Sequence, residues 1–209
     1  SRKRYHFVRG DVADERLLSY LFDEHHFDAV IHLAAETHGD RSIADTRHFI
    51  HTNIRGTHAL LDTLRKYPVK RLVHISTDEV YGDRSELGSA TEKSQFQPSN
   101  PYSASKAAGD LIVQSYIHTY QIPAIIFRPS NNFGPRQYPE KIIPLAISNM
   151  LLGEKFPLHG TGDYARSWIF VEDFCRAVCL FLHEGKIGEA YNVGGTQKTN
   201  NEVIAIIAK

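Results

Sequence analysis

Short apolar runs, rich in β-branched residues, alternate along the chain with segments of helical periodicity. The runs that predict strands are 5–12, 29–35, 71–77, 123–130 and 189–195. The segments that predict helices are 14–24, 41–66, 102–120, 139–152 and 171–184. Because the strands are apolar almost throughout, we expect a parallel sheet that helices cover on both faces. The sequence therefore predicts an α/β fold built on a doubly wound parallel sheet.

A glycine-rich turn is missing from this pattern. Doubly wound sheets that bind dinucleotides usually begin with a strand, a Gly-rich turn and a helix whose N-terminus holds the pyrophosphate. The chain contains neither G-x-G-x-x-G nor G-x-x-G-x-x-G. We therefore expect a Rossmann-like sheet that is incomplete at its N-terminus. The chain is then either a fragment or holds the pyrophosphate in another way.

The composition argues against several classes of protein. Lysine and arginine total 24, as do aspartate and glutamate, so the chain lacks the bulk positive charge of many nucleic-acid binders. No apolar run reaches the roughly 18 residues of a membrane span, and no signal-peptide pattern opens the chain. We expect a soluble, cytoplasmic protein that binds neither nucleic acid nor a membrane.

The cysteines and histidines form no recognisable metal pattern. Cys175 and Cys179 recur with the apolar residues of a helical stripe, so we expect both thiols to be buried and inert in a reducing cytosol. Among the 12 histidines, only His48 and His51 have a plausible helical ligand spacing, and no third ligand accompanies them in an obvious pattern. The sequence predicts no metal site.

Two adjacent carboxylates, Asp78 and Glu79, follow the strand predicted at 71–77. Ligands of open parallel sheets bind beyond the carboxyl ends of the strands, so acid and base groups are well placed there. Successive residues of an ideal strand point to opposite faces, and the two carboxylates can act on one ligand only if the chain has already turned. The alternative is a solvated strand end, with Asp78 as the N-cap of the next helical turn.

Tyr102 and Lys106 lie four residues apart in PYSASK (101–106) and share one face of the predicted helix. A tyrosine of ordinary pKa, about 10, is a poor base at neutral pH. A neighbouring ammonium favours the phenolate, so we expect Lys106 to lower the pKa of Tyr102. For an isolated Y-x-x-x-K pattern the alternative is an ordinary amphipathic helix surface. The helix start at Asn100–Pro101 and the preceding strand that ends in Ser-Thr favour the catalytic interpretation.

Seven segments occur in the order found in the extended, nucleotide-sugar-modifying branch of the short-chain dehydrogenase/reductase superfamily. They are HLAAETHGDRSI (32–43), TNIRGTHALLDTLR (52–65), STDEVYG (76–82), PYSASKAAGD (101–110), SNNFGPRQYPEKIIP (130–144), FPLHGTGDYARSWIFVEDFCRA (156–177) and EAYNVGG (189–195). Together they resemble the dTDP-glucose 4,6-dehydratases over nearly all of the chain. The resemblance implies an NAD-dependent lyase that converts dTDP-glucose, or a relative, to its 4-keto-6-deoxy form.

The resemblance also implies roles for five residues of a catalytic site. Tyr102 would take the proton of the C4 hydroxyl, and Lys106 would stabilise the phenolate and hold the nicotinamide ribose. Thr77 would hydrogen-bond the C4 oxygen. Glu79 would remove the C5 proton while Asp78, kept protonated with help from a nearby carboxylate, would expel the C6 hydroxyl as water. The hydride taken from C4 would return to C6.

Further contacts are implied by position in the matching segments. The cofactor-binding residues would be Asp11, Val12, Leu33, Ala34, Ala35, Glu36, Thr52, Ser76, Tyr102, Lys106 and Asn132. The substrate-binding residues would be Thr37, Thr77, Asn131, Lys141, Ile142, Leu145, Pro157, Arg166 and Asn201. Arg166 is easiest to justify physically, because a guanidinium can bind a diphosphate through two bonds. Its alternative is a surface arginine, and Asn131 and Asn132 could instead be turn residues.

The same resemblance divides the chain into two parts. Residues 1–130 would form the NAD-binding domain without its first βα unit. Residues 131–209 would form mostly the substrate-binding portion, with segments around 165–195 returning to the first domain. A homodimer is expected by analogy with the family.

Two kinds of rival function remain open. A nucleotide-sugar 4-epimerase or a UDP-glucuronate decarboxylase of the same superfamily would keep the tyrosine and the lysine. These enzymes generally lack the Asp-Glu pair, which favours the dehydratase. The other rival is an inactive truncated fragment or a non-catalytic interaction domain.

Overall fold

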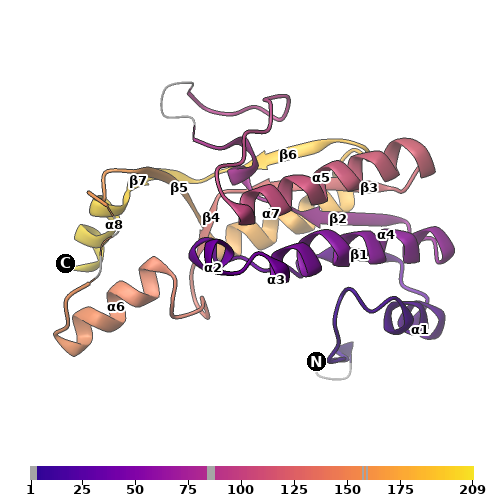
Figure 1. The fold of residues 1–209 in the computed structure, drawn as a ribbon, viewed down its shortest axis with the longest axis horizontal. Helices are drawn as coiled ribbons and strands as arrows, with labels where there is room; N and C mark the ends of the chain where they lie inside the picture. The colour runs from indigo at the N-terminus through magenta and orange to yellow at the C-terminus, as the bar shows by residue number, and fades with distance from the viewer. Residues whose placement is uncertain (1–3, 84–87, 157, 159) are drawn as a thin grey trace. The chain divides into compact units, whose positions relative to one another are not determined.

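The computed structural model describes residues 4–83, 88–156, 158 and 160–209. It has the predicted α/β class, with helices and strands that alternate along most of the chain (Figure 1). The chain divides into two compact units. The first comprises residues 1–128 with 181–191, and the second comprises residues 129–180 with 192–209.

The first unit is built on a four-stranded sheet in the order β1-β2-β3-β6. Its strands are β1 (Ala29–His32), β2 (Arg71–Ile75), β3 (Ala124–Pro129) and β6 (Ala190–Val193), the last of which begins in this unit. β1 pairs in parallel with β2, and β2 in parallel with β3, with Ile31 opposite Val73 and Val73 opposite Ile125. The carboxyl ends of these three strands therefore lie at one edge of the sheet.

Helical elements connect the strands of the first unit. They are α1 (Glu15–His25), α2 (Gly39–Ala44), α3 (Arg47–Phe49), the π-helix η2 (Ile50–Gly56), α4 (Thr57–Lys66), the 3₁₀-helix η3 (Asp78–Tyr81) and α5 (Pro101–Tyr120). The segment predicted as one helix over 41–66 is thus divided, because α2 ends before Asp45 and a π-helix precedes α4. Helix α5 starts as predicted: Asn100 and Ser103 form a capping box, and Pro101 occupies the first helical position.

The hydrophobic core of the first unit lies between the sheet and helices α4 and α5. Leu61, Val113 and Ile126 are almost fully buried there. On the opposite face, Phe127 of β3 packs against Phe181, with ring centroids 5.3 Å apart. Phe181 belongs to the end of α7 (Val171–Glu184) that lies in this unit. Because side chains alternate along a strand, Ile126 and Phe127 cover opposite faces, and helices cover both sides of the sheet.

The second unit contains a three-stranded sheet in the order β4-β5-β7. Its strands are β4 (Asn131–Phe133), β5 (Ala165–Phe170) and β7 (Thr196–Thr199), with β4 parallel and β7 antiparallel to β5. Its helices are α6 (Ile142–Leu152), the larger part of α7, and α8 (Asn200–Ile207). Neither these three strands nor α8 were predicted from the sequence.

Two sequence predictions about local structure are wrong. Residues 5–12 form no strand, and 5–11 are exposed without regular structure. No strand in the described part of the chain pairs with this run, and a strand needs a partner for its backbone N–H and C=O groups. Cys175 and Cys179 are exposed rather than buried. Helix α7 buries Phe174 and Val178 instead, so its apolar stripe is wider than the face that is covered.

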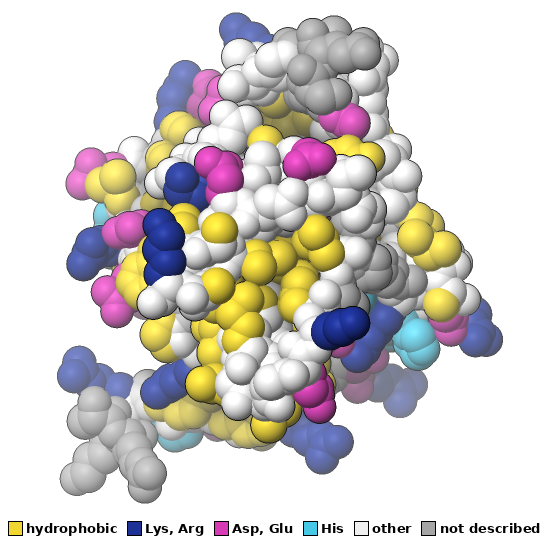
Figure 2. Space-filling view, turned by 90° about the vertical axis from the view of Figure 1, so that its left-hand side faces the viewer, with side chains coloured by type: hydrophobic (Ala, Val, Ile, Leu, Met, Phe, Trp, Pro, Cys, Tyr) yellow, Lys and Arg dark blue, Asp and Glu magenta, His cyan; other side chains and the backbone are white. Residues whose placement is uncertain are grey.

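Large hydrophobic side chains also remain exposed on two helices of the second unit. Ile147, Leu151 and Leu152 are exposed on α6, and Ile206 on α8. Figure 2, which faces the side of Figure 1 where these helices lie, shows hydrophobic side chains gathered across the surface. None of the helices in the described ranges is long and apolar enough to cross a membrane.

Candidate active site

The chain has turned where the two carboxylates lie. β2 ends at Ile75, and Thr77 is the N-cap of η3, which carries Asp78 and Glu79. Thr77 Oγ1 accepts a hydrogen bond from the backbone N of Glu79 at 3.3 Å and donates one to Asp78 Oδ1 at 3.4 Å. The cap is therefore Thr77 and not Asp78. In a 3₁₀ turn, successive side chains are about 120° apart, so both carboxylates can approach one ligand.

The tyrosine and lysine lie on the first two turns of α5 and are both buried. The side chain of Lys106 donates a hydrogen bond from Nζ to the backbone O of Ile75 at 2.6 Å, at the end of β2. Tyr102 shares a hydrogen bond with Thr77. The structure thus brings Thr77, Tyr102 and Lys106 together beside the carboxylate turn. These residues belong to one compact unit.

The pKa of Tyr102 lies well above the ordinary value of 10.0. Burial is the largest cause, the negative charge of Glu79 adds to it, and the hydrogen bond with Thr77 offsets only part of the increase. The prediction that Lys106 lowers this pKa is wrong: the pKa is raised, and the ammonium of Lys106 is bound to the Ile75 carbonyl oxygen. Tyr102 is therefore neutral at neutral pH, and its phenolate needs additional positive charge nearby.

Lys106 is itself an unusually weak cation. Burial lowers its pKa to about 8, although the charge of Asp110, one turn further along α5, partly opposes the shift. Two buried histidines lie in the same core, His32 on β1 and His74 on β2, with ring centroids 5.4 Å apart. Burial lowers the pKa of both rings. They are therefore neutral near pH 7, and Lys106 is the nearby base that still carries its proton.

Four of the predicted cofactor residues line one hollow of about 580 Å³ in the first unit. They are Asp11, Val12, Ala34 and Thr52, and Arg9 and Gly10 complete the lining. Asp11 accepts hydrogen bonds from the backbone N of Ala13 at 2.8 Å and from His51 Nε2 at 2.9 Å. The first of these is the main reason why the pKa of Asp11 lies below its ordinary value. The hollow therefore presents an ionised carboxylate.

The remaining cofactor residues of the first unit lie along the same edge of the sheet. Leu33 is exposed, whereas Ala35 and Glu36 are half-buried. Ser76 is buried, and its backbone N donates to the backbone O of Phe127 at 2.7 Å. Backbone and carboxylate groups beside an open hollow fit the adenosine and nicotinamide-ribose ends of a dinucleotide. The chain supplies no Gly-rich turn for the pyrophosphate.

Asn53 supports two elements of the candidate site and was not predicted from the sequence. It lies in the π-helix η2 and is buried. Its side chain accepts a hydrogen bond from Glu36 N at 2.9 Å and donates to Glu36 O at 3.0 Å and to Ser105 Oγ at 2.8 Å. Asn53 thereby joins the loop after β1 to the helix that carries Tyr102. The only signal in the sequence was a polar residue inside a helical apolar pattern.

The second unit holds most of the predicted substrate residues and one predicted cofactor residue, Asn132. Asn131 and Asn132 form strand β4 opposite Trp168 and Ile169, so they are strand rather than turn residues. Asn132 Nδ2 donates to the backbone O of Ser130 at 3.1 Å, whereas its buried Oδ1 has no partner among the described residues. A buried acceptor without a partner costs about 1–3 kcal/mol, so a donor from a bound ligand would fit this position.

Other predicted substrate residues are spread over this unit. Lys141 is the N-cap residue of α6, which contains Ile142 and Leu145. Arg166 is exposed on β5. Asn201 donates hydrogen bonds from α8 to the backbone O of Thr161 and to Asp163 Oδ1, each at 3.0 Å. Thr37 is exposed in the first unit. Pro157 lies outside the described residues.

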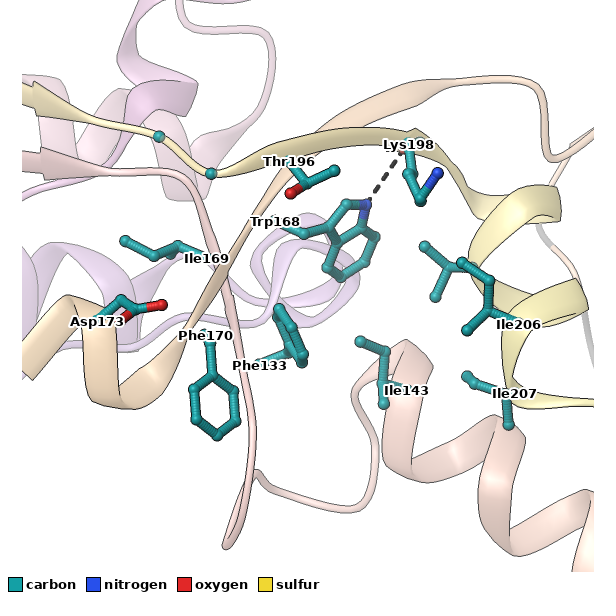
Figure 3. A pocket seen from close by; sticks show the side chains of 13 residues that line it. Phe133, Ile143, Trp168, Ile169, Phe170, Asp173, Thr196, Lys198, Ile206 and Ile207 are labelled. Atoms are coloured by element: carbon teal, nitrogen blue, oxygen red, sulfur yellow. Dashed lines mark hydrogen bonds between the residues drawn. The ribbon is translucent and has the colours of Figure 1, made fainter. Parts of the chain in front are cut away.

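The second unit also contains an apolar pocket of about 510 Å³ that includes none of the predicted substrate residues (Figure 3). Its lining residues are Phe133, Ile143, Trp168, Ile169, Phe170, Asp173, Gly194, Gly195, Thr196, Lys198, Val203, Ile206 and Ile207. The Trp168 indole donates from Nε1 to the backbone O of Lys198 at 3.2 Å, drawn as a dashed line in Figure 3. This lining is more apolar than a sugar diphosphate requires, so we do not assign the pocket to the substrate.

Fold and site together define a class of protein. A parallel sheet with a Tyr–Lys helix beside the carboxyl ends of its strands is the arrangement of the short-chain dehydrogenase/reductase superfamily. The chain belongs to the NAD dependent epimerase/dehydratase family, whose sequence profile matches residues 1–194.

Several proteins resemble this chain closely. It is 46% identical over 211 residues to a dTDP-glucose 4,6-dehydratase of Xanthomonas campestris pv. campestris (strain B100), covering 96% of this chain and 60% of that one. The crystal structure of DesIV, a dTDP-glucose 4,6-dehydratase from Streptomyces venezuelae with NAD and TYD bound, matches with a TM-score of 0.94 and 45% identity. That match covers 98% of this chain and 63% of DesIV.

A more distant relative belongs to the rival class. UDP-glucose 4-epimerase of Thermotoga maritima, solved with UDP-glucose, matches with a TM-score of 0.92 and 28% identity over 98% of this chain and 68% of the epimerase. The fold is therefore common to dehydratases and epimerases, and the identity is higher with the dehydratases. The chain spans about 60% of the length of the curated dehydratases it matches.

Proposed function

We propose that the protein containing this chain uses NAD to dehydrate a nucleotide-activated glucose, with dTDP-glucose as the substrate. The product is the 4-keto-6-deoxy sugar. Three observations support the proposal: the identity of 46% to a named dTDP-glucose 4,6-dehydratase, the NAD bound in the DesIV structure, and the paired carboxylates on η3. The third is a property of this chain itself.

Oxidation at C4 begins the reaction. NAD, when bound, would accept the hydride from C4 and return it to C6. Tyr102 takes the proton of the C4 hydroxyl, and Thr77, which is hydrogen-bonded to Tyr102, orients the two oxygens. Because burial and Glu79 oppose the phenolate, Lys106 must release the Ile75 carbonyl and turn its ammonium toward Tyr102.

Elimination of water follows from the ketone at C4, which acidifies the C5 hydrogen. Glu79 removes the C5 proton, and Asp78 donates a proton to the C6 hydroxyl, which leaves as water. The carboxyl group of Glu79 exchanges its proton with solvent and then donates a proton to C5 as C6 is reduced. Tyr102 has gained one proton and Asp78 has lost one, so one proton passes between them before the next turnover.

The observation that carries the proposal is the position of the turn. Oxidation and reduction at C4, as in an epimerase, need only Tyr102, Lys106 and a hydrogen-bond donor. Elimination across C5 and C6 also needs an acid and a base on one sugar. The chain turns immediately after Thr77 and so places two carboxylates on the first residues of η3, beside Tyr102.

The test is a product analysis with the longest polypeptide that the gene encodes. The protein is incubated with NAD in deuterated water and, separately, with dTDP-glucose, UDP-glucose and UDP-glucuronate, and products are identified by NMR. A 4-keto-6-deoxy sugar with deuterium at C5, formed fastest from dTDP-glucose, is the expected result. An epimerised or decarboxylated sugar would refute the dehydratase assignment and favour the corresponding rival. Unchanged sugars despite demonstrated NAD binding would favour a non-catalytic role.

A homodimer is part of the proposal. Leu111 and Tyr120 are exposed on the outer side of α5, and Ile50 is exposed at the start of η2. Hydrophobic side chains on neighbouring helices are suited to packing against a second copy of the chain. Light scattering of the same polypeptide checks this: the mass of two chains is expected, and the mass of one chain at micromolar concentration would contradict it.

A further inference from the structure

The largest fully buried side chain of the first unit is a charged one, Arg128, near the end of β3. Its relative exposure is 1%. A buried guanidinium is costly unless its donors are satisfied and its charge is paired. The partners of Arg128 therefore identify which elements of the fold this side chain connects.

One partner lies on the helix that carries the tyrosine and lysine. Arg128 Nε donates to Asp110 Oδ2 at 2.8 Å, and Asp110 follows Lys106 by one turn on α5. Burial tends to raise the pKa of Asp110, but the contact with His74 and the charge of Arg128 outweigh it, and the pKa is lower than usual. The pair is therefore charged on both sides, and His74 Nε2 lies 3.5 Å from Asp110 Oδ1.

The other side-chain partner lies on the turn that carries the carboxylates. Arg128 Nη1 donates to the hydroxyl of Tyr81 at 2.6 Å and to the backbone O of Glu92 at 3.3 Å. Tyr81 is the last residue of η3 and is 1% exposed. The guanidinium carbon also lies 4.8 Å from the ring centroid of Phe96, a cation–π distance.

The short helix η3 depends on contacts with the rest of the chain to hold its position. A 3₁₀-helix of four residues, as η3 is, has few internal hydrogen bonds and no stability of its own. Its first end is held by the Thr77 cap and its last end by Tyr81, whose neighbour Val80 accepts a backbone hydrogen bond from Gln97 at 3.0 Å. Arg128 hydrogen-bonds both Tyr81 on η3 and Asp110 on α5.

We propose that Tyr81 and Arg128 are positioning residues that hold the acid–base turn η3 at a fixed place relative to the Tyr102–Lys106 helix. This role rests on the proposed dehydratase function. Neither residue touches the sugar or the cofactor in this role. The hydrogen bond of Tyr81 to Arg128 fixes the positions of Asp78 and Glu79 on η3. Removal of the Tyr81 hydroxyl therefore slows elimination more than oxidation.

The test uses Tyr81→Phe in the longest encoded polypeptide, with Tyr116→Phe as the matched control. Each variant removes one buried or half-buried tyrosine hydroxyl and leaves the ring; the Tyr116 hydroxyl donates to Asp62 Oδ1 at 2.8 Å, away from the proposed site. For Tyr81→Phe we expect kcat to fall about 10- to 100-fold, with KM changed less than about twofold, since small misplacements of catalytic groups have effects of this size. The control retains kcat.

Two further readouts separate positioning from a general loss of stability. In single turnovers of Tyr81→Phe, reduced nicotinamide accumulates because oxidation outpaces elimination, and exchange of C5 hydrogen with solvent slows by the same factor as kcat. In the cofactor-free protein, hydrogen exchange of the peptide spanning residues 77–82 becomes faster, while that of the β2 peptide does not. Arg128→Lys, which keeps a charge near Asp110 but cannot reach both partners in the same way, should reproduce the pattern if Tyr81→Phe does not fold.

The outcomes distinguish the two proposals. If the wild type makes the 4-keto-6-deoxy sugar and Tyr81→Phe lowers oxidation and elimination equally, or changes only stability, the positioning role is refuted and the dehydratase stands. If the wild type makes no such product, the proposed function fails and this role fails with it.

Discussion

Replacing Lys106 with an uncharged residue should make the folded chain more stable and abolish C4 oxidation. The side chain is 5% exposed, and burial lowers its pKa from 10.5 to about 8. At about 1.4 kcal/mol per pH unit between these values, keeping the ammonium in the folded chain costs about 3 kcal/mol. Lys106→Met removes that cost and also the hydrogen bond to Ile75 O, which contributes about 2 kcal/mol because its donor is charged. We expect the cofactor-free variant to be more stable by about 1 kcal/mol near neutral pH, while C4 oxidation is lost.

The pH dependence of this difference provides the sharper test. Below about pH 8 the folded and unfolded chains both carry the proton on Lys106, and the cost is fully present. Between about pH 8 and pH 10.5 the unfolded chain binds more protons at this lysine than the folded chain does. The free energy of unfolding of the wild type therefore rises with pH, and the stability difference between Lys106→Met and the wild type becomes smaller. The ordinary Lys66→Met, at the exposed end of α4, should change stability by less than about 0.5 kcal/mol at every pH.

Urea unfolding of wild type, Lys106→Met and Lys66→Met, near pH 7 and again just below pH 10, measures these differences as shifts of midpoint at constant m-value. The reasoning is refuted if Lys106→Met is less stable than the wild type near neutral pH. It is also refuted if its stability difference is the same at both pH values, because Lys106 would then not titrate between them.

Two other predictions concern the end of the carboxylate turn and the cysteines. Gly82→Ala should destabilise the protein by at least about 2 kcal/mol, because Gly82 has a φ of 72° and a Cβ there would overlap the Gln97 carbonyl. The matched control Gly88→Ala, with a φ of 71° and open space around it, should cost about 1 kcal/mol. Equal midpoints of the two variants in thermal or urea unfolding would contradict this difference. Cys175 and Cys179 should both react with a thiol reagent in the native 209-residue chain, as their exposure requires, and a reaction that occurs only after unfolding would restore the buried-stripe prediction.

The sequence predicted the strands of the main sheet because each is a nearly continuous apolar run. The run at 5–12 also contains aromatic and β-branched residues and yet forms no strand, since pairing depends on a neighbour that the pattern of one segment cannot reveal. β4 was missed for the opposite reason. Its three residues, Asn131–Phe133, include two asparagines, and only their pairing with β5 makes them a strand.

The catalytic candidates were visible in the sequence because they lie close together along the chain, as Asp78 does to Glu79 and Tyr102 to Lys106. The Tyr81–Arg128–Asp110 network was not visible, because Tyr81 and Arg128 are 47 residues apart. The error over the pKa of Tyr102 has a similar origin. Helical spacing places Lys106 on the correct face, but only the structure shows that its ammonium is bound to the Ile75 carbonyl.

The central claim is that Glu79 and Asp78 divide base and acid roles on one sugar. The most direct measurement is deuterium incorporation at C5 of dTDP-glucose in deuterated water, compared between wild type, Glu79→Gln and Asp78→Asn. Glu79→Gln should lower incorporation by about 10²- to 10⁴-fold while reduced nicotinamide still forms, as expected on losing a general base. Asp78→Asn should keep the incorporation and slow the loss of water. Undiminished C5 exchange in Glu79→Gln would contradict the account.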